Sequence, residues 1–194
     1  MADASNTWRL ASRLGLPATI AYLRDTYPAP QWHDHPNFGD LAAFWMQVHA
    51  SLRDQGGQLQ QITHAFREGV LDATAFQQAF VPRFNHFLQH LEGHHQIEDA
   101  AYFPKFRLLD PRMQTGFDVL ENDHDVIHQA AVTALEGARM LLVALPRGAA
   151  QARSASDHYA DATDRLMQLL ARHLADEEDL VIPALLEHGE RGVG

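Results

Sequence analysis

Hydrophobic residues recur every three to four positions along four long stretches of the chain, which is the period of an amphipathic α-helix. This pattern predicts helices over 39–67, 73–102, 113–145 and 151–182, with Gly or Pro at the joins. No stretch alternates as a half-buried strand does. The second stretch is the clearest, with large apolar side chains at Phe76, Phe80, Phe84, Phe87 and Leu91.

Two of the three joins are short, so the first two helices and the last two should each form an antiparallel hairpin. Helices of about thirty residues are about 45 Å long. We therefore predict an all-α fold, an up-down-up-down four-helix bundle over 39–188. Residues 1–38 are rich in Pro and are expected to form an N-terminal arm packed on the bundle.

Composition narrows the class of protein. With 194 residues, 46% of them hydrophobic, the chain can bury one core. A net charge of −10 disfavours nucleic acid and an anionic membrane surface. The absence of cysteine excludes disulfides and thiolate metal sites. The first residues lack the apolar stretch of a signal peptide, and the apolar run 140–145 is too short to span a bilayer. We expect a cytoplasmic monomer or homodimer.

Histidine is unusually frequent, with 13 copies against 15 Lys and Arg together. One pattern occurs twice: a histidine, a glutamate four residues later and a proline six residues after that. It appears at His94, Glu98 and Pro104 and again 79 residues further on. Residues four apart share one face of a helix, so each repeat presents an imidazole and a carboxylate together.

Five histidines fall at one level of the predicted bundle, about 26–33 Å from the turns that close the two hairpins, and two glutamates of the same layer lie one turn higher. Buried carboxylates and imidazoles need charged partners or a metal ion. Seven donors exceed the needs of one ion and fit two ions bridged by the glutamates. Donors without sulfur suit iron or manganese, with zinc possible. The predicted donors are His49, His94, Glu98, His124, His128, His173 and Glu177.

This ordered set of motifs resembles the hemerythrin family, whose bacterial members are called HHE cation-binding domains. The resemblance rests on His49, His94-x-x-x-Glu98, His124-x-x-x-His128 and His173 followed by an acid, and it covers about residues 39–185. It implies two non-haem iron ions. His124, His128 and His173 would hold the first, His49 and His94 the second, and Glu98 would be one bridge.

The second bridge is open between two neighbours, Glu177 and Glu178. The invertebrate oxygen carriers place the bridging acid five residues after the last histidine, which is Glu178, and many bacterial relatives place it four residues after, which is Glu177. Four residues leave a side chain about 40° from the direction of His173, whereas five leave it about 140° away. Helix geometry therefore favours Glu177.

The resemblance implies a protein that binds O2, or a related diatomic ligand such as NO, reversibly, for oxygen carriage, delivery or sensing. Apolar residues such as Phe84, Leu91 and Ile127 would line the pocket. No nucleophile or acid–base pair is placed for organic catalysis, so a binding protein is favoured over an enzyme. Alternatives are a diiron protein that consumes peroxide or nitric oxide or donates iron for cluster repair, and an interaction module stabilised by zinc.

Several acids and histidines have other readings. Glu92-x-x-His95 and Glu121-x-x-His124 also fit the Glu-x-x-His element of ferritin-like diiron proteins, although both lie on consecutive helices. His90 is a spare candidate ligand. His95 points about 100° away from His94 and is expected to be peripheral. Asp176 and Asp179 are expected to form a solvated face.

Overall fold

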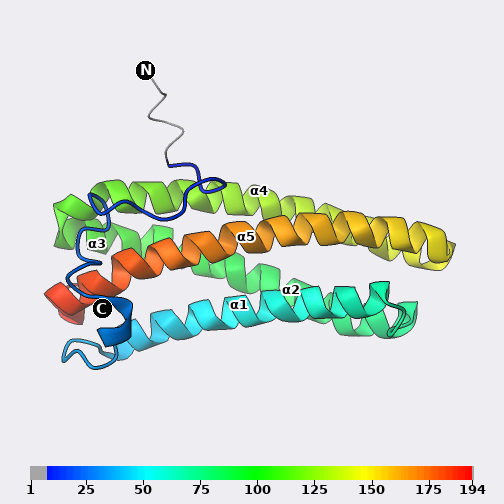
Figure 1. The fold of residues 1–194 in the computed structure, drawn as a ribbon, viewed down its shortest axis with the longest axis horizontal. Coiled ribbons are helices and arrows are strands. Elements are labelled where there is room, and N and C mark those ends of the chain that lie inside the picture. Colours follow the sequence, from blue (N-terminus) through cyan, green and yellow to red (C-terminus); the bar gives the residue numbers. More distant parts are fainter. Residues whose placement is uncertain (1–7, 194) are drawn as a thin grey trace, which may run out of the picture. The chain divides into compact units, whose positions relative to one another are not determined.

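The computed structural model describes residues 8–193, and all of its regular structure within that range is helical. Four long helices, α1 (Asp40–Arg67), α2 (Ala73–Ile97), α4 (Gln114–Ala144) and α5 (Ala149–His188), and one short helix, α3 (Phe103–Leu109), follow one another along the chain (Figure 1). The predicted all-α four-helix bundle is therefore confirmed.

The helix boundaries follow local signals in the sequence. Asp72 caps the start of α2, where its side chain accepts a hydrogen bond of 2.8 Å from the backbone N–H of Ala75. Gly69 adopts a φ of +73° directly after α1, and Gly148 a φ of +112° before α5. Such values favour glycine, so the two tight turns lie where glycine occurs.

Two prolines predicted to end helices do not end them. Helix α5 continues through Pro183 to His188, so the predicted end at residue 182 is wrong. The residues around this proline are fully buried, and their packing outweighs the backbone hydrogen bond that proline lacks. After α2, Glu98–Tyr102 form a π-helical turn (η3), in which the Phe103 N–H donates to the Glu98 carbonyl, and α3 then continues past Pro104.

The long helices run through two compact units, each with its own core. The second unit comprises 51–93 and 126–168. Its core is a stack of phenylalanine rings, with Phe76 and Phe80 4.9 Å apart between centroids and Phe80 and Phe84 5.1 Å apart. The buried ring of Tyr159 meets Phe80 edge-on at 5.1 Å. Such offset and edge contacts are favourable beyond the area that they bury.

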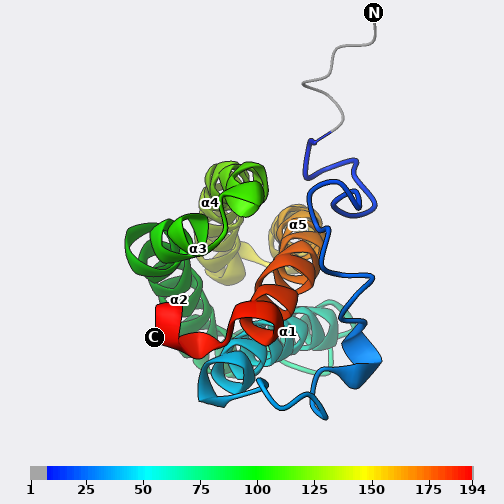
Figure 2. The same ribbon diagram turned by 90° about the vertical axis from the view of Figure 1, so that its left-hand side faces the viewer.

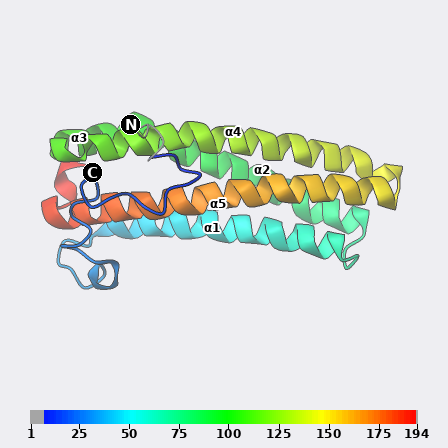
Figure 3. The same ribbon diagram turned by 45° about the horizontal axis from the view of Figure 1, so that its top comes forward.

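The first unit comprises 1–50, 94–125 and 169–194, of which the structure describes 8–50, 94–125 and 169–193. The described part of the predicted N-terminal arm, 8–38, belongs to it, and residues 1–7 lie outside the described residues. Leu16, Ile20 and Trp32 of the arm are buried in a core with α1, α3, α4 and α5. The arm runs along α5, where the Asn37 side chain donates to the Leu186 carbonyl at 2.7 Å (Figures 2 and 3).

The segment Pro111–Arg147, which contains α4, is long and apolar enough to cross a membrane, judged by length and composition only. Long apolar helices of non-membrane proteins also meet this criterion, so it is weak evidence. Its exposed apolar side chains, Val126, Val132, Met140 and Val143, alternate with polar residues such as Gln129 and Glu136.

Candidate metal centre

Buried histidines and glutamates of the first unit form two overlapping sets of donors. In each set, one ligand atom per residue lies within 4.8 Å of every other. Donor group 1 consists of His49, His94, Glu98 and Glu177. Donor group 2 consists of Glu98, His124, His173 and Glu177, and His95 forms a further set of this kind with His124 and His173. Both glutamates therefore belong to both groups.

Helix α2 supplies two adjacent histidines, one to donor group 1 and one to the further set with His124 and His173. Glu98 follows His94 by four residues and His95 by three, so on a helix its carboxylate lies between the directions of the two imidazoles. The His94 ring is 5.1 Å from that of His49, and the His95 ring stacks on that of His124 at 4.0 Å and 9°. Glu98 thus lies between the direction of His94, a member of donor group 1, and that of His95, which stacks on His124 of donor group 2.

The two glutamates each turn one oxygen towards each group. Glu98 Oε1 lies 3.1 Å from His94 Nδ1, and its Oε2 lies 3.5 Å from His124 Nε2. Glu177 Oε1 lies 3.3 Å from His49 Nε2, and its Oε2 lies 3.2 Å from His173 Nε2. Each carboxylate therefore faces both donor groups.

Glu177 has a further contact that fixes its orientation. The indole N–H of Trp45 donates to its Oε1 at 2.6 Å, and both side chains are buried. Trp45 itself packs edge-on against Tyr102 and Phe106, at 5.0 and 6.0 Å between ring centroids. The carboxylate is therefore held by an aromatic side chain whose own position is fixed by packing.

A second layer of carboxylates lies behind three of the histidines. Nδ1 of His49 is 2.9 Å from Glu178 Oε1, and Nδ1 of His124 is 2.8 Å from Asp99 Oδ1. A histidine that donates from Nδ1 to a carboxylate keeps its Nε2 lone pair for a metal, and such partners fix both tautomer and ring orientation. The third pair, His173 with Asp123, has Nδ1 3.4 Å from Oδ2.

The imidazoles differ in how readily they carry a proton. Burial lowers the pKa of His94 to about 3 and places that of His95 well below the usual value. Burial also acts on His173, but hydrogen bonds to Asp123 and Glu177 outweigh it and raise its pKa to about 9. At neutral pH His94 and His95 are consequently neutral and offer lone pairs.

The two shared carboxylates are shifted in opposite directions. Burial, and then the charge of neighbouring Glu177, raise the pKa of Glu98 well above its usual value. For Glu177 the effect of burial is outweighed by His49 and His173, which lower its pKa. A cation between the groups would favour the ionised form of both glutamates and compete with the protons held there.

The buried polar atoms that face one another fit cations. Within residues 8–193, no hydrogen bond reaches Nε2 of His49, His94 or His95, either oxygen of Glu98, or Oε2 of Glu177. The Nε2 atoms of His124 and His173 lie 3.2 Å apart. Buried polar atoms are almost always satisfied, and a cluster of unsatisfied nitrogen and oxygen acceptors is what metal coordination would satisfy.

Of the predicted donors, six are brought together in the first unit, namely His49, His94, Glu98, His124, His173 and Glu177. Glu178, the alternative bridge, lies behind His49 in the second layer. His128 belongs to the second unit, where its side chain is 54% exposed and Nδ1 is 3.4 Å from Glu92 Oε2. The spare candidate His90 lies in the same unit, 3.0 Å from the Gln55 amide nitrogen.

Two expectations about neighbouring residues are wrong. His95 is not peripheral, because it is 7% exposed and belongs to a donor set. Asp176 is fully buried and accepts a hydrogen bond from Leu16 N, while Asp179 is 3.4 Å from an Arg24 nitrogen, so neither forms a solvated face. Asp176 and Asp179 instead bind residues of the arm.

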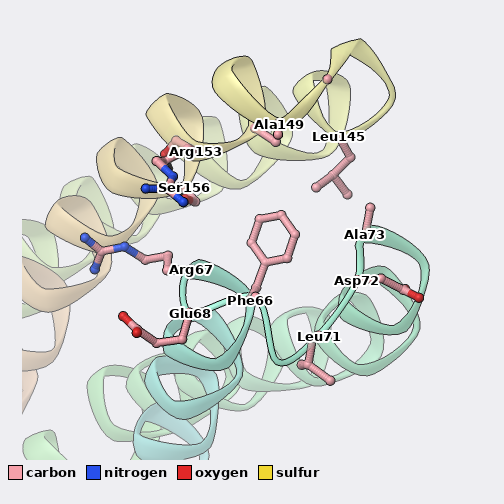
Figure 4. A pocket seen from close by; sticks show the side chains of 13 residues that line it. Phe66, Arg67, Glu68, Leu71, Asp72, Ala73, Leu145, Ala149, Arg153 and Ser156 are labelled. Atoms are coloured by element: carbon pink, nitrogen blue, oxygen red, sulfur yellow. Dashed lines mark hydrogen bonds between the residues drawn. The ribbon is translucent and has the colours of Figure 1, made fainter.

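One hollow of the second unit is unrelated to these donors. It has a volume of about 470 Å³ and lies where the turn after α1 faces the turn before α5 (Figure 4). Phe66, Leu71 and Leu145 supply its apolar lining, with Arg67 and Arg153 beside them, and none of its lining residues is a histidine. The candidate metal site is therefore the cluster of buried histidines and glutamates in the first unit.

A family model for the hemerythrin HHE cation-binding domain matches residues 40–185. The chain belongs to this family. No curated protein and no solved structure matches it. Membership and the buried donors together support metal-cation binding at a site of histidines and glutamates, and the matched range contains all residues of both donor groups of this hemerythrin-family protein.

Proposed function

We propose that this hemerythrin-family protein holds two iron ions and binds O2, or a related diatomic ligand such as NO, reversibly at that centre. One observation carries the proposal. Glu98 and Glu177 each face both donor groups, one oxygen to each, and three histidines flank one group and two the other.

The donor chemistry supports iron. Five imidazoles and two carboxylates without any thiolate suit iron or manganese, and zinc also accepts such donors. We assign His49 and His94 to one ion and His95, His124 and His173 to the other, with Glu98 and Glu177 as bridges. In this assignment His95 takes the place that the family pattern gives to His128.

The unequal histidine count supports binding of a small ligand. An ion held by two histidines would have fewer protein donors and could keep a coordination position for a small ligand, whereas an ion held by three would be closer to saturation. When bound, two ferrous ions would supply the electrons that reversible oxygen binding requires.

The side chains around the donors support reversibility. Phe103 stacks near His124 at 5.5 Å, and Trp45 lies 6.4 Å from His49, all of them buried. These apolar walls exclude water and disfavour escape of a charged, reduced product. The buried donors include no nucleophile beside a base, so a binding protein is favoured over an enzyme for organic substrates.

The test is metal analysis together with absorption spectra of protein purified without oxygen and loaded with ferrous iron. We expect two irons per chain and a visible charge-transfer band that appears in air, fades under argon and returns over repeated cycles. One colourless zinc ion per chain, or colour that is lost permanently as added peroxide is consumed, would overturn the proposal in favour of a structural or a peroxide-consuming role.

Matched variants connect the signal to the site. His94→Ala and His173→Ala should each abolish the dinuclear spectrum. His64→Ala is the control, because His64 is exposed on α1 in the second unit. Unaltered iron content in the first two variants would contradict the assignment of these histidines.

A further inference from the structure

Arg13, in the N-terminal arm, is a buried cation with three directed contacts to the helices of the metal centre. Its side chain is only 2% exposed. Nη1 donates to Asp123 Oδ1 at 2.9 Å, Nη2 donates to Asp123 Oδ2, and Nε donates to Asp176 Oδ2 at 2.7 Å. The guanidinium thus donates two hydrogen bonds to the carboxylate of Asp123 and a third to that of Asp176.

The two carboxylates lie next to residues of the donor groups. Asp123 directly precedes His124 on α4, and Asp176 directly precedes Glu177 on α5. Asp123 Oδ2, which Arg13 holds, is also 3.4 Å from His173 Nδ1. A chain of contacts therefore runs from the arm through one carboxylate to an imidazole of donor group 2.

We propose that Arg13 is a positioning residue for the metal centre: it holds Asp123 in the orientation that accepts a hydrogen bond from His173 Nδ1 and so keeps His173 Nε2 turned towards the cation. The inference rests on metal binding at the site of the proposed function and is independent of O2. Partners of this kind commonly change metal affinity 10–100-fold when removed.

Charge and geometry explain why arginine occupies this place. Asp123 and Asp176 are 3% and 0% exposed, and two carboxylates that deep require cationic partners. Arginine presents several N–H groups in a rigid planar fork and can bind one carboxylate bidentately while reaching another. Lysine would supply the charge without the fork.

Arg13 lies outside the part of the chain that the family model matches, whereas Asp123 and Asp176 lie inside it. The family model begins at residue 40, and Arg13 precedes that range by 27 positions. The first described residues of the arm lie beside α4 and α5 (Figure 3), and Arg13 contacts one residue of each. The second layer behind His173 thus depends on a segment that accompanies the family domain.

The experiment compares Arg13→Gln, Arg13→Lys and the matched control Arg24→Gln in the full-length protein, with cobalt(II) as the probe ion. Arg24 lies in the same arm and pairs with Asp179 at 3.4 Å, and that carboxylate has no contact with a histidine among the described residues. Competition with a chelator gives the cobalt dissociation constant, and the visible cobalt spectrum at saturation reports ligand geometry.

We expect Arg13→Gln to raise the dissociation constant about 10–100-fold and to shift the cobalt spectrum even at saturation. Arg13→Lys should lower affinity less but still shift the spectrum. Arg24→Gln should match the wild type within about twofold. A residue that only stabilised the fold would weaken binding yet give an unchanged spectrum at saturation.

A double-mutant cycle with Asp123→Asn tests whether Arg13 affects metal binding through Asp123. If Arg13 acts through Asp123, adding Arg13→Gln to Asp123→Asn costs no more than about twofold further, whereas fully additive losses would overturn the proposal. If Arg13→Gln does not fold, Arg13→Lys takes its place in the cycle. A wild type that binds fewer than two cobalt ions would count against the metal centre itself. Two ions with wild-type spectra in both Arg13 variants would overturn only the role of Arg13.

Discussion

Two single substitutions, one of His95 and one of His128, distinguish the donor set seen in the structure from the donor set that the family pattern predicts. His95 is buried, stacks on His124 and belongs to a donor set. His128 is 54% exposed and lies near Glu92. We therefore expect His95→Ala to remove a ligand, and His128→Ala to leave the centre intact.

The magnitude follows from these environments. Loss of a second-layer partner commonly costs 10–100-fold in metal affinity, so loss of a direct ligand should cost at least about 100-fold, or about 2.7 kcal/mol. The exposed pair of His128 and Glu92 is worth about 0–1 kcal/mol, and its loss leaves metal affinity within about twofold.

The free energy of unfolding of the metal-free protein should change less in His95→Ala than that of the metal-loaded protein. Truncating a large buried side chain to alanine typically costs about 2–5 kcal/mol, while removing the unbonded His95 Nε2 returns about 1–3 kcal/mol. His95→Phe isolates the ligand effect, because a phenyl ring retains the stacking on His124 and supplies no nitrogen. This variant should be as stable as the wild type without metal and as impaired as His95→Ala with metal.

The assay is chelator competition for iron or cobalt, combined with urea unfolding of metal-free and metal-loaded protein. The difference in unfolding free energy between loaded and metal-free protein should shrink by at least about 2.7 kcal/mol in both His95 variants. Normal affinity in His95→Ala, together with a 100-fold loss in His128→Ala, would refute the reasoning and restore the family pattern.

Other predictions concern the second layer and the cores. Trp45→Phe removes the indole N–H that reaches Glu177, and we expect the metal-free protein to lose about 1.5–3 kcal/mol in urea unfolding; an unchanged midpoint would mean that this bond contributes nothing. Hydrogen bonds from Arg112 hold the pKa of Asp110 below its usual range, so the stabilisation is present above about pH 4 and is lost as pH falls through the lower pKa of the folded state. Wild type and Asp110→Asn should therefore differ by about 2 kcal/mol at pH 7 and converge towards pH 2, and a constant difference would contradict this. Phe80→Ala, in the core of the second unit, should lower the free energy of unfolding by about 3–5 kcal/mol in chemical denaturation, and a loss below 1 kcal/mol would contradict the stacked core.

The long helices could be predicted because their signals are local. The 3.6-residue period and the glycines at the turns place α1 and α4 within one residue of their observed ends. Proline misled the prediction at Pro183 and Pro104, because tertiary packing and a π-helical turn let the chain stay helical through both. Such packing depends on residues that are distant in the sequence, so the residues next to each proline carry no signal of it.

The site was predictable as far as helical spacing reaches. Residues four apart on one face led directly to His94 with Glu98 and to His173 with Glu177. His95 was missed because its angle was measured from His94. Measured from Glu98, it lies three residues away on the other side of the carboxylate, and this was the available signal. The acids behind the histidines could not be predicted, because each contacts a different segment of the chain: Asp99 is 25 residues from His124, and Asp123 is 110 residues from Arg13.

The π-helical turn at Glu98–Tyr102 has a consequence for how the chain tolerates a change of length. Its extra residue brings Phe103 over Glu98, so that the same helix presents ligands below the turn and the aromatic cover of His124 above it. Deleting Ala100 would let the turn close to an ordinary helix, in which Phe103, then four residues after Glu98, keeps its place over that residue. The loss of a single codon within this turn would therefore leave the proposed ligands and the aromatic cover of His124 in their places.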